Sequence, residues 1–234
     1  MAELSPPRAA PADERRASLS AWGDDARGAF SGARDPARLE AAVVRFHRTL
    51  DATIAATVEG HGLALDCKRG CSHCCHLRVH VQPHEAFALA AWLRRHVEPE
   101  RLAEIVRRLK ENVARTRELG EEARKRTNIA CALLAPDGAC SAYEARPAQC
   151  RRYHSLRLAA CEAFRTQPDE SIESPLHPAL AHNAAVIITQ AQHAVRAAGL
   201  EAENADLNFA LLEALENPKA WRRWKDGKKP FPKA

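Results

Sequence analysis

Apolar residues recur at steps of three and four along several stretches of the chain, which is the spacing of an α-helix that buries one face. The first such stretch begins at Pro36 and ends at Gly60 or Gly62. Pro83 opens a second helical stretch, and Pro99 opens a third that runs towards residue 126. Proline suits the first turn of a helix, because the N–H group that it lacks would have no partner there.

Two further helices are expected in the C-terminal part. Ser174 followed by Pro175 indicates an N-cap and a first helical residue, and the helix after them would close at Gly199. A last helix would end before Pro218. No alternating pattern typical of a strand is found. The sequence therefore predicts a mostly α fold, a helical bundle with irregular cysteine-rich loops packed between the helices.

The two ends of the chain differ from its middle. Residues 1–35 mix proline, glycine and charge with little periodicity, so we expect them to be largely disordered, with a short helix near Trp22. Residues 36–216 would form a single helical domain. Residues 217–234 form a basic tail with two tryptophans. Such a tail can bind nucleic acid, although Trp221 and Trp224 could instead cap the core from one helix face.

Composition limits the function classes only loosely. The 234-residue chain carries a net charge of +5, which is compatible with an acidic partner but does not require one. The N-terminal segment lacks the apolar stretch of a signal peptide, and no run approaches the length of a membrane span. We therefore expect a cytoplasmic protein with no membrane partner. Cysteines in that compartment stay reduced, so they indicate metal ligands or redox groups.

Cysteine carries the strongest signal in the chain, because all eight cysteines lie between residues 67 and 161. We expect all eight to be metal ligands: Cys67, Cys71, Cys74, Cys75, Cys131, Cys140, Cys150 and Cys161. Thiolates are soft anionic ligands, and four of them suit either zinc or an iron–sulfur cluster. The region 67–161 is therefore the candidate metal-binding region of the helical domain.

The spacing of the first cysteines favours iron over zinc without deciding between them. Cys67, Cys71 and Cys74 have the C-x3-C-x2-C spacing, which can surround three corners of a [4Fe–4S] cluster. Structural zinc more often uses two facing C-x2-C pairs, and the second half of this region has none. The adjacent Cys74 and Cys75 could serve different metals. Two four-thiolate sites, or one cluster with spare thiols, both fit eight cysteines.

These residues resemble the CxxCxxCC or YkgJ-like family of zinc- or iron-chelating bacterial proteins. The likeness covers residues 67–161 and includes the first cysteine loop, Glu85, and the segment from Cys131 through Arg146-Pro147-Ala-Gln-Cys150-Arg151-Arg-Tyr153 to Cys161. Ala132 stands where the family usually has proline. The resemblance implies metal binding without a settled activity. A more distant similarity to flagellin lysine-N-methylases would imply an iron–sulfur centre and methyl transfer.

Four further residues of the matching segments could support the ligands. They are Glu85, Arg146, Arg151 and Tyr153. An Arg guanidinium or a Tyr hydroxyl can donate a hydrogen bond to a ligand sulfur. The alternative is packing, with Arg146-Pro147 as the entry to a short helix and Tyr153 as a core aromatic residue.

Three functional hypotheses follow from this pattern. The first is a metal-binding protein whose cysteine loops wrap one or two centres of iron–sulfur or zinc, with metal ions as its partners. The second is an enzyme that uses an iron–sulfur cluster in redox or methyl-transfer chemistry, for which no catalytic residue can be named. The third is a metal-stabilised module that binds nucleic acid or protein through its basic tail. The sequence does not decide whether the protein is an enzyme.

Overall fold

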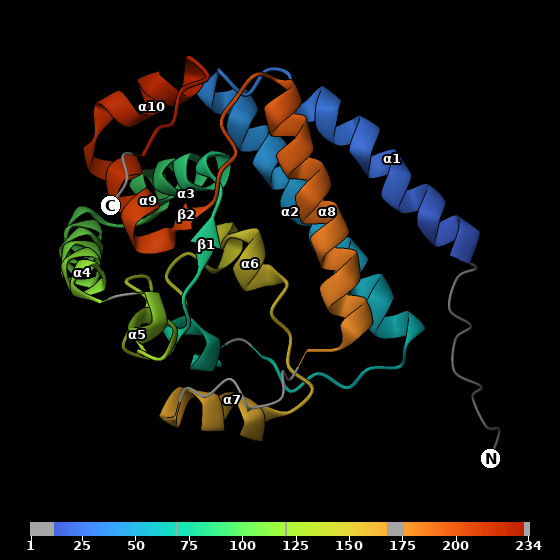
Figure 1. Ribbon diagram of the computed structural model, residues 1–234, viewed down its shortest axis with the longest axis horizontal. Coiled ribbons are helices and arrows are strands. Elements are labelled where there is room, and N and C mark those ends of the chain that lie inside the picture. Colours follow the sequence, from blue (N-terminus) through green and yellow to red (C-terminus); the bar gives the residue numbers. More distant parts are fainter. Residues whose placement is uncertain (1–11, 69, 120, 168–175, 232–234) are drawn as a thin grey trace.

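The computed structural model describes residues 12–68, 70–119, 121–167 and 176–231 (Figure 1). Within these residues the α-helices are α1 (Ala12–Phe30), α2 (Pro36–Gly60), α3 (Pro83–His96), α4 (Pro99–Glu118), α5 (Glu121–Lys125), α6 (Ala148–Arg151), α7 (Leu158–Thr166), α8 (Pro178–Ala197), α9 (Leu207–Glu216) and α10 (Pro218–Lys225). Two 3₁₀ turns, η1 (His73–His76) and η2 (Tyr143–Ala145), and two short strands, β1 (His80–Val81) and β2 (Ala205–Asp206), complete the described elements. The fold is mostly α, as the sequence predicts.

Three long helices form one side of the molecule, where α1, α2 and α8 lie alongside one another (Figure 1). The Asp35 side chain caps α2 by accepting a hydrogen bond from the Arg38 backbone N–H at 2.9 Å. Trp22 of α1 stacks on Phe46 of α2 and donates its indole N–H to the Ile187 carbonyl of α8 at 3.2 Å. A single side chain thus ties the three helices together.

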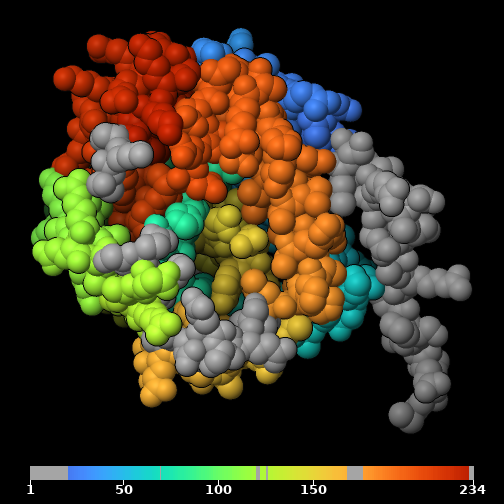
Figure 2. Space-filling model, viewed as in Figure 1, coloured from blue at the N-terminus to red at the C-terminus, as the bar shows by residue number. Residues whose placement is uncertain are grey.

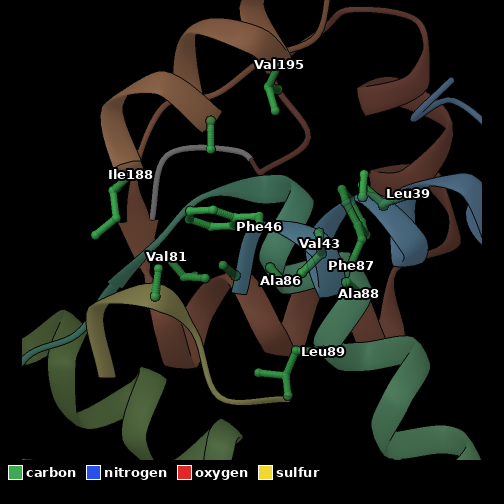
Figure 3. Close-up of a cluster of buried hydrophobic side chains, with 14 of the residues drawn as sticks. Leu39, Val43, Phe46, Val81, Ala86, Phe87, Ala88, Leu89, Ile188 and Val195 are labelled. Atoms are coloured by element: carbon green, nitrogen blue, oxygen red, sulfur yellow. The ribbon is translucent and has the colours of Figure 1, made fainter. Parts of the chain in front are cut away.

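The second group of helices, α3, α4, α9 and α10, packs against the first through α3. Phe46 of α2 is 1% exposed and lies between side chains of α3 and α8 in the close-up of the core (Figure 3). Its ring is 6.1 Å from that of His84, which belongs to the first turn of α3. Both groups of helices therefore share one hydrophobic core.

The N-terminal helix differs from our expectation for residues 1–35. We expected disorder with a short helix near Trp22, whereas α1 is helical from Ala12 to Phe30. Trp22, Ala26 and Phe30 are buried at intervals of four residues and pack into the shared core. The many small and charged residues between them conceal this apolar stripe in the sequence. Residues 1–11 lie outside the described part of the chain.

Several predicted helix boundaries also shift. The third predicted helix ends as α4 at Glu118, and a separate helix, α5, begins at Glu121. The expected N-cap at Ser174-Pro175 lies outside the described residues. The helix that follows it begins at Pro178, and the His177 side chain accepts a hydrogen bond from the Ala179 N–H. The end at Gly199 agrees with the prediction, since Gly199 has the positive φ of a helix terminator.

Two features of the cysteine-rich region were not predicted. Strands β1 and β2 pair in antiparallel fashion, with His80 opposite Asp206 and Val81 opposite Ala205. This pairing joins the end of the first cysteine loop to the start of α9. Helix α7 carries Cys161 and has no buried residue. In Figure 1, α7 lies at the lower edge of the molecule, whereas α6 lies near the centre, beside β1.

The basic tail packs into the core through its tryptophans. Trp224 is 0% exposed, and its indole N–H donates to the Glu201 carbonyl at 2.7 Å. Phe87 of α3 lies 5.2 Å from Trp221 and 5.4 Å from Trp224 between ring centres. The packing alternative for the two tryptophans is therefore confirmed. None of the described helices has the combination of length and apolar character that a bilayer span requires.

Replacing Trp224 by alanine should lower the free energy of unfolding by about 3–5 kcal/mol, because a fully buried ring and its hydrogen bond are lost. Chemical denaturation followed by circular dichroism measures this change. The control is Arg222→Ala, an exposed position on the same helix, where a change within about 0.5 kcal/mol is expected. Equal effects at both positions would contradict the packed role of the tail helix.

Candidate metal centre

Seven of the eight cysteines line a single cavity of about 390 Å³. They are Cys67, Cys71, Cys74, Cys75, Cys131, Cys140 and Cys150. The molecular surface is hollowed over α6, between β1 and α8 (Figure 2). Each of the eight cysteines is a free thiol. The chain therefore brings thiols from two distant segments to one internal surface, which is the donor set that soft metal ions prefer.

The first cysteine loop is held by its own backbone and by the second segment. Cys74 and Cys75 lie in the 3₁₀ turn η1, where the Cys75 N–H donates to the Ser72 carbonyl at 3.0 Å. The Cys75 carbonyl then accepts the Cys131 N–H at 2.8 Å. This backbone bond and the 3.3 Å bond from the Ile129 N–H to the His76 carbonyl join the two cysteine segments beside the cavity.

Ser155 anchors the beginning of the first loop. Its backbone N–H lies 3.0 Å from the Cys67 sulfur and donates to it. Its carbonyl accepts the Asp66 N–H at 2.9 Å, so the two segments are joined on both sides of the cysteine. A backbone N–H that donates to sulfur stabilises the thiolate form, which is the form that binds metal.

The second cysteine segment is fixed by α4. Leu134 and Cys140 form an antiparallel bridge around the turn at Pro136-Asp137-Gly138. The Arg108 guanidinium of α4 donates to the carbonyls of Leu134 at 2.6 Å and Cys131 at 2.9 Å. Because Arg108 satisfies two loop carbonyls at once, the positions of Cys131 and Cys140 follow from the packing of α4.

A close approach between the two loops depends on glycine at position 138. Gly138 has φ +81°, and a Cβ atom built there would lie 3.3 Å from the Gly70 carbonyl oxygen. A larger residue would therefore be strained in its backbone and would also press on the loop that carries Cys71. The turn signal in the sequence thus has a second role in setting the spacing between the loops.

Helix α6, which carries Cys150, is positioned by Glu85. The Glu85 carboxylate is 3% exposed, and its Oε1 accepts the Ala148 N–H at 2.7 Å. The same oxygen lies 3.0 Å from Nε2 of His47 on α2. Burial alone would raise the pKa of Glu85, but the hydrogen bond and charge of His47 outweigh it and the pKa is lowered. Glu85 is therefore an ionised group that joins α2, α3 and α6.

Arg151 holds the residues just before α6. Its guanidinium donates to Asp51 of α2 at 2.6 Å, to the Arg146 carbonyl at 2.9 Å and to the Glu144 carbonyl. All three acceptors are oxygens. The candidate roles of Glu85 and Arg151 are thus carried out through the backbone around Cys150, and the hydrogen bonds of their side chains go to groups other than sulfur.

Arg146 and Tyr153 lie nearer to the thiols. The Arg146 guanidinium stands 3.8 Å above the Tyr143 ring, and its charge lowers the pKa of both Cys74 and Cys140. Burial raises the pKa of Tyr153 to about 12, and the charges of Cys161, Cys74 and Cys67 add to this rise. Both side chains also line the cavity.

Burial keeps most of the thiols protonated at neutral pH. It raises the pKa of Cys131 to about 11 and that of Cys150 well above its ordinary value. The pair formed by Cys74 and Cys75 behaves differently. Their mutual hydrogen bond lowers the pKa of Cys74 to about 7 and raises that of Cys75 far above its ordinary value. Within this pair, Cys74 is therefore the thiol that ionises first.

The mutual effects of the thiols on their pKa values divide them into two groups. Cys71 and Cys161 raise the pKa of Cys67, and Cys71 raises that of Cys161, so we call these three the outer group. The inner group consists of Cys75, Cys131, Cys140 and Cys150, which are linked in the same way. Cys74 acts on members of both groups. The adjacent pair Cys74-Cys75 thus lies where the two groups meet.

Within the described part of the chain, no three Cys, His, Asp or Glu side chains already form a set that could hold one metal ion. The thiols surround the cavity at a wider spacing than a coordination sphere. Their chemical type fits zinc or iron, and binding would draw the sulfurs inward by changes in rotamer and loop position.

Comparison with known protein families agrees with this donor set. Residues 66–172 match the CxxCxxCC family model, described as "Putative zinc- or iron-chelating domain". This segment is a CxxCxxCC domain. No curated protein and no solved structure matches the chain. The distant similarity to flagellin lysine-N-methylases therefore gains no support.

Several residues that position the cysteine segments of the CxxCxxCC domain were not recognised from the sequence. Ser155, Arg108 and Asn112 hold the cysteine segments through the backbone or sulfur, and Asn112 donates to the Ala130 carbonyl at 2.9 Å. His47 could have been found, because it interrupts the apolar face of α2 with a polar side chain that is buried. Arg108 carried no such signal within the charged surface of α4.

Replacing Glu85 by alanine should destabilise the protein by about 3 kcal/mol or more, because His47 and the Ala148 N–H lose their shared partner inside the core. Glu85→Gln keeps an oxygen acceptor and should cost less. Because the pKa of Glu85 is lowered by folding, its ionised form stabilises the protein above the ordinary carboxyl pKa, and that contribution disappears as the pH falls through the folded-state value.

Denaturation at neutral and acidic pH measures both effects. The difference between the wild-type protein and Glu85→Gln should shrink on acidification. The matched control is Glu59→Gln at an exposed position of α2, which should leave stability nearly unchanged. An unchanged difference across the pH range would contradict an ionised Glu85 in the core.

Proposed function

We propose that this protein is a metal-binding protein that holds two thiolate-bound centres, one in the outer group together with Cys74 and one in the inner group. The observation that carries the proposal is the convergence of seven free thiols on one cavity, with the eighth beside them. Each centre would then have four cysteines. The outer centre would use Cys67, Cys71, Cys74 and Cys161, and the inner centre Cys75, Cys131, Cys140 and Cys150.

The outer centre is proposed to be a [4Fe–4S] cluster, and the inner centre zinc or iron. The C-x3-C-x2-C spacing of Cys67, Cys71 and Cys74 supports a cluster, since the three thiolates come from one short loop. The inner group draws its thiols from four places in the fold: Cys75 from η1, Cys131 from the segment before the 134–140 hairpin, Cys140 from that hairpin and Cys150 from α6. Such a set is typical of a cross-link that ties loops together, which is the structural role of four-thiolate zinc.

The electrostatics of the site favours the binding of metal cations to both groups of thiols. Burial first, and the charges of neighbouring thiols second, raise the pKa values of Cys131 and Cys150, so these thiols resist ionisation when no cation is bound. A metal ion offsets the thiolate charges and releases the thiol protons. Arg146 and Arg108 offset part of the remaining negative charge, because each lowers the pKa of at least one thiol. A bound cluster would supply one-electron chemistry, and bound zinc would supply a rigid cross-link.

Metal analysis with visible spectroscopy on protein purified without oxygen tests the proposal. The wild-type protein should contain iron and acid-labile sulfide and absorb broadly in the visible region. Cys161→Ser should lose the cluster and keep the metal of the inner group, whereas Cys140→Ser should do the reverse. Ala139→Ser is the matched control, since it adds a hydroxyl beside Cys140 and keeps all eight thiols.

The outcomes separate the possibilities. Complete loss of metal in both cysteine variants would indicate one shared centre and contradict the two-centre arrangement. Colourless protein with zinc alone would contradict the cluster and keep metal binding. Folded wild-type protein without any metal would overturn the proposal.

Metal binding should also order α7. This nine-residue helix has no buried side chain and is held by polar contacts, such as the 2.8 Å bond from the Leu158 N–H to Asp66 and the Glu162 carboxylate near His73. Isolated helices of this length are marginal in water. A metal bond to Cys161 would therefore become its strongest attachment.

Hydrogen–deuterium exchange compares metal-loaded and metal-depleted protein. Amides of α7 should exchange at least about tenfold more slowly when metal is bound, which corresponds to about 1.4 kcal/mol of local stability. Cys161→Ser should abolish the difference in α7. Helix α8, which packs in the core, serves as the internal reference and should change little. Equal protection of α7 with and without metal would contradict this attachment.

A further inference from the structure

The cysteine cavity is rich in positive charge. Four cationic residues line it, namely Lys68, Arg78, Arg146 and Arg152, together with the histidines His80 and His154. Among the described residues that line the cavity, none is Asp or Glu. Two carboxylates that contact the cysteine segments have other roles, since Glu85 accepts the Ala148 N–H of α6 and Asp66 accepts the Leu158 N–H. A concave surface with one sign of charge concentrates ions of the opposite sign.

Two cationic side chains act on the pKa values of the thiols. Arg146 acts on Cys74 and Cys140 from the cavity wall, and Arg108 acts on Cys131 from α4. Lys68, Arg78 and Arg152 line the same cavity in addition to Arg146. The positive charge therefore extends beyond the cations that act on the sulfurs.

Nε of Arg146 is buried without a hydrogen-bond partner within the described structure. Nδ1 of His154 is buried as well, and the ring of His154 interacts with the Arg151 backbone. A buried polar group without a partner costs about 1–3 kcal/mol, so native proteins usually satisfy such groups with a ligand or an ordered water. Both nitrogens belong to residues that line the cavity, where an oxygen of a bound molecule could reach them.

The rest of the lining is suited to an organic body. Leu77, Val79, Leu133 and Leu207 contribute apolar side chains. The volume of about 390 Å³ falls within the range of small-molecule pockets, which is about 300–1,000 Å³. The hollow over α6 gives the cavity an opening to solvent (Figure 2). Leu133 and Leu207 are already almost fully buried, so the half-buried Leu77 and Val79 are the side chains that such a body would cover.

We propose that the cavity binds a small organic anion beside the thiols. Its carboxylate or phosphate group lies at Arg146, Arg152 and His154, and its apolar body lies on Leu77 and Val79. The place of this ligand next to a metal centre rests on the proposed function, whereas the anion site itself depends on the cations and the cavity. The site gives the protein a substrate or effector class, which thiols alone do not define.

Isothermal titration calorimetry on the metal-loaded full chain tests this inference with four probes. Hexanoate and hexyl phosphate carry the two anionic groups on one apolar body, hexanamide is the neutral analogue, and inorganic phosphate lacks the body. The anionic hexyl probes should bind at least about tenfold more tightly than hexanamide, because hydrogen bonds to a charged group are worth about 1.5–3 kcal/mol. A preference between hexanoate and hexyl phosphate identifies the anionic group.

Variants locate the site. Arg152→Gln and His154→Ala should each weaken binding of the preferred hexyl anion several-fold or more. The matched control Arg223→Gln removes the same charge at an exposed position of α10 and should leave binding unchanged. The metal content of each variant is measured alongside, so that loss of a centre is recognised separately from loss of the anion site.

Each outcome either supports or overturns the anion site. Metal-loaded protein that does not distinguish the anions from hexanamide overturns the anion site and leaves the proposed function intact. In that case the cations serve only to balance the thiolates, and Arg152→Gln should lower metal affinity instead. Anion binding by protein that never acquires metal supports the site and overturns the proposed function. If Arg223→Gln weakened anion binding as much as the cavity variants do, the binding would be non-specific and the proposed site would be wrong.

Discussion

The carboxylate of Glu85 is the constraint on which the placement of the cavity depends. An ionised group inside a protein is tolerated only where partners replace the water that it has lost. Glu85 finds those partners in His47 of α2 and in the backbone of α6. Since Glu85 itself belongs to α3, three helices must reach their final positions together for the charge to be satisfied. The position of Cys150 is set by the same contact, because Cys150 lies two residues beyond the N–H group that Glu85 binds.

The helices and the cysteine loops are stabilised by different means. The helical layers are held by burial of apolar side chains from Trp22 to Trp224, and this core needs no sulfur chemistry. The loops are held mainly by hydrogen bonds to backbone groups. Examples are the bonds that the Arg108 guanidinium donates and the bond between the backbones of Cys131 and Cys75. The frame can therefore be rigid while the thiols keep the freedom to move inward. This division of roles accounts for thiols that face one cavity without already forming a coordination sphere.

Much of the fold could be predicted because its helices have strong local signals. Helices α2, α3 and α4 begin at prolines and show regular apolar spacing, so their starts agree with the prediction. Helix α1 was predicted only as a short helix near Trp22, because its buried face combines alanine with few large residues. The β1–β2 pair was missed because two-residue strands carry no readable alternation. In each case the missing information is tertiary packing, which local sequence does not contain.

The site was predictable in its residues and less so in its organisation. The confinement of eight cysteines to one region indicated a shared centre, and their convergence requires only that the region fold compactly. The partition into inner and outer groups depends on which loops meet, and this is set by contacts between residues far apart in the chain. Arg151 was a residue that could donate to a ligand sulfur, with packing as the alternative, and its guanidinium binds oxygens of Asp51, Arg146 and Glu144.

The position of Cys161 has a consequence for how the protein is made. The inner group is complete once residue 150 has left the ribosome, but the outer group also needs Cys161. Helices α1 and α2 pack against α8, which is synthesised later still. Three thiols of the first loop are therefore exposed to oxidants during synthesis for as long as the intervening chain takes to emerge. Delivery of metal to the nascent chain would have to follow this order, with the inner group filled before the outer one.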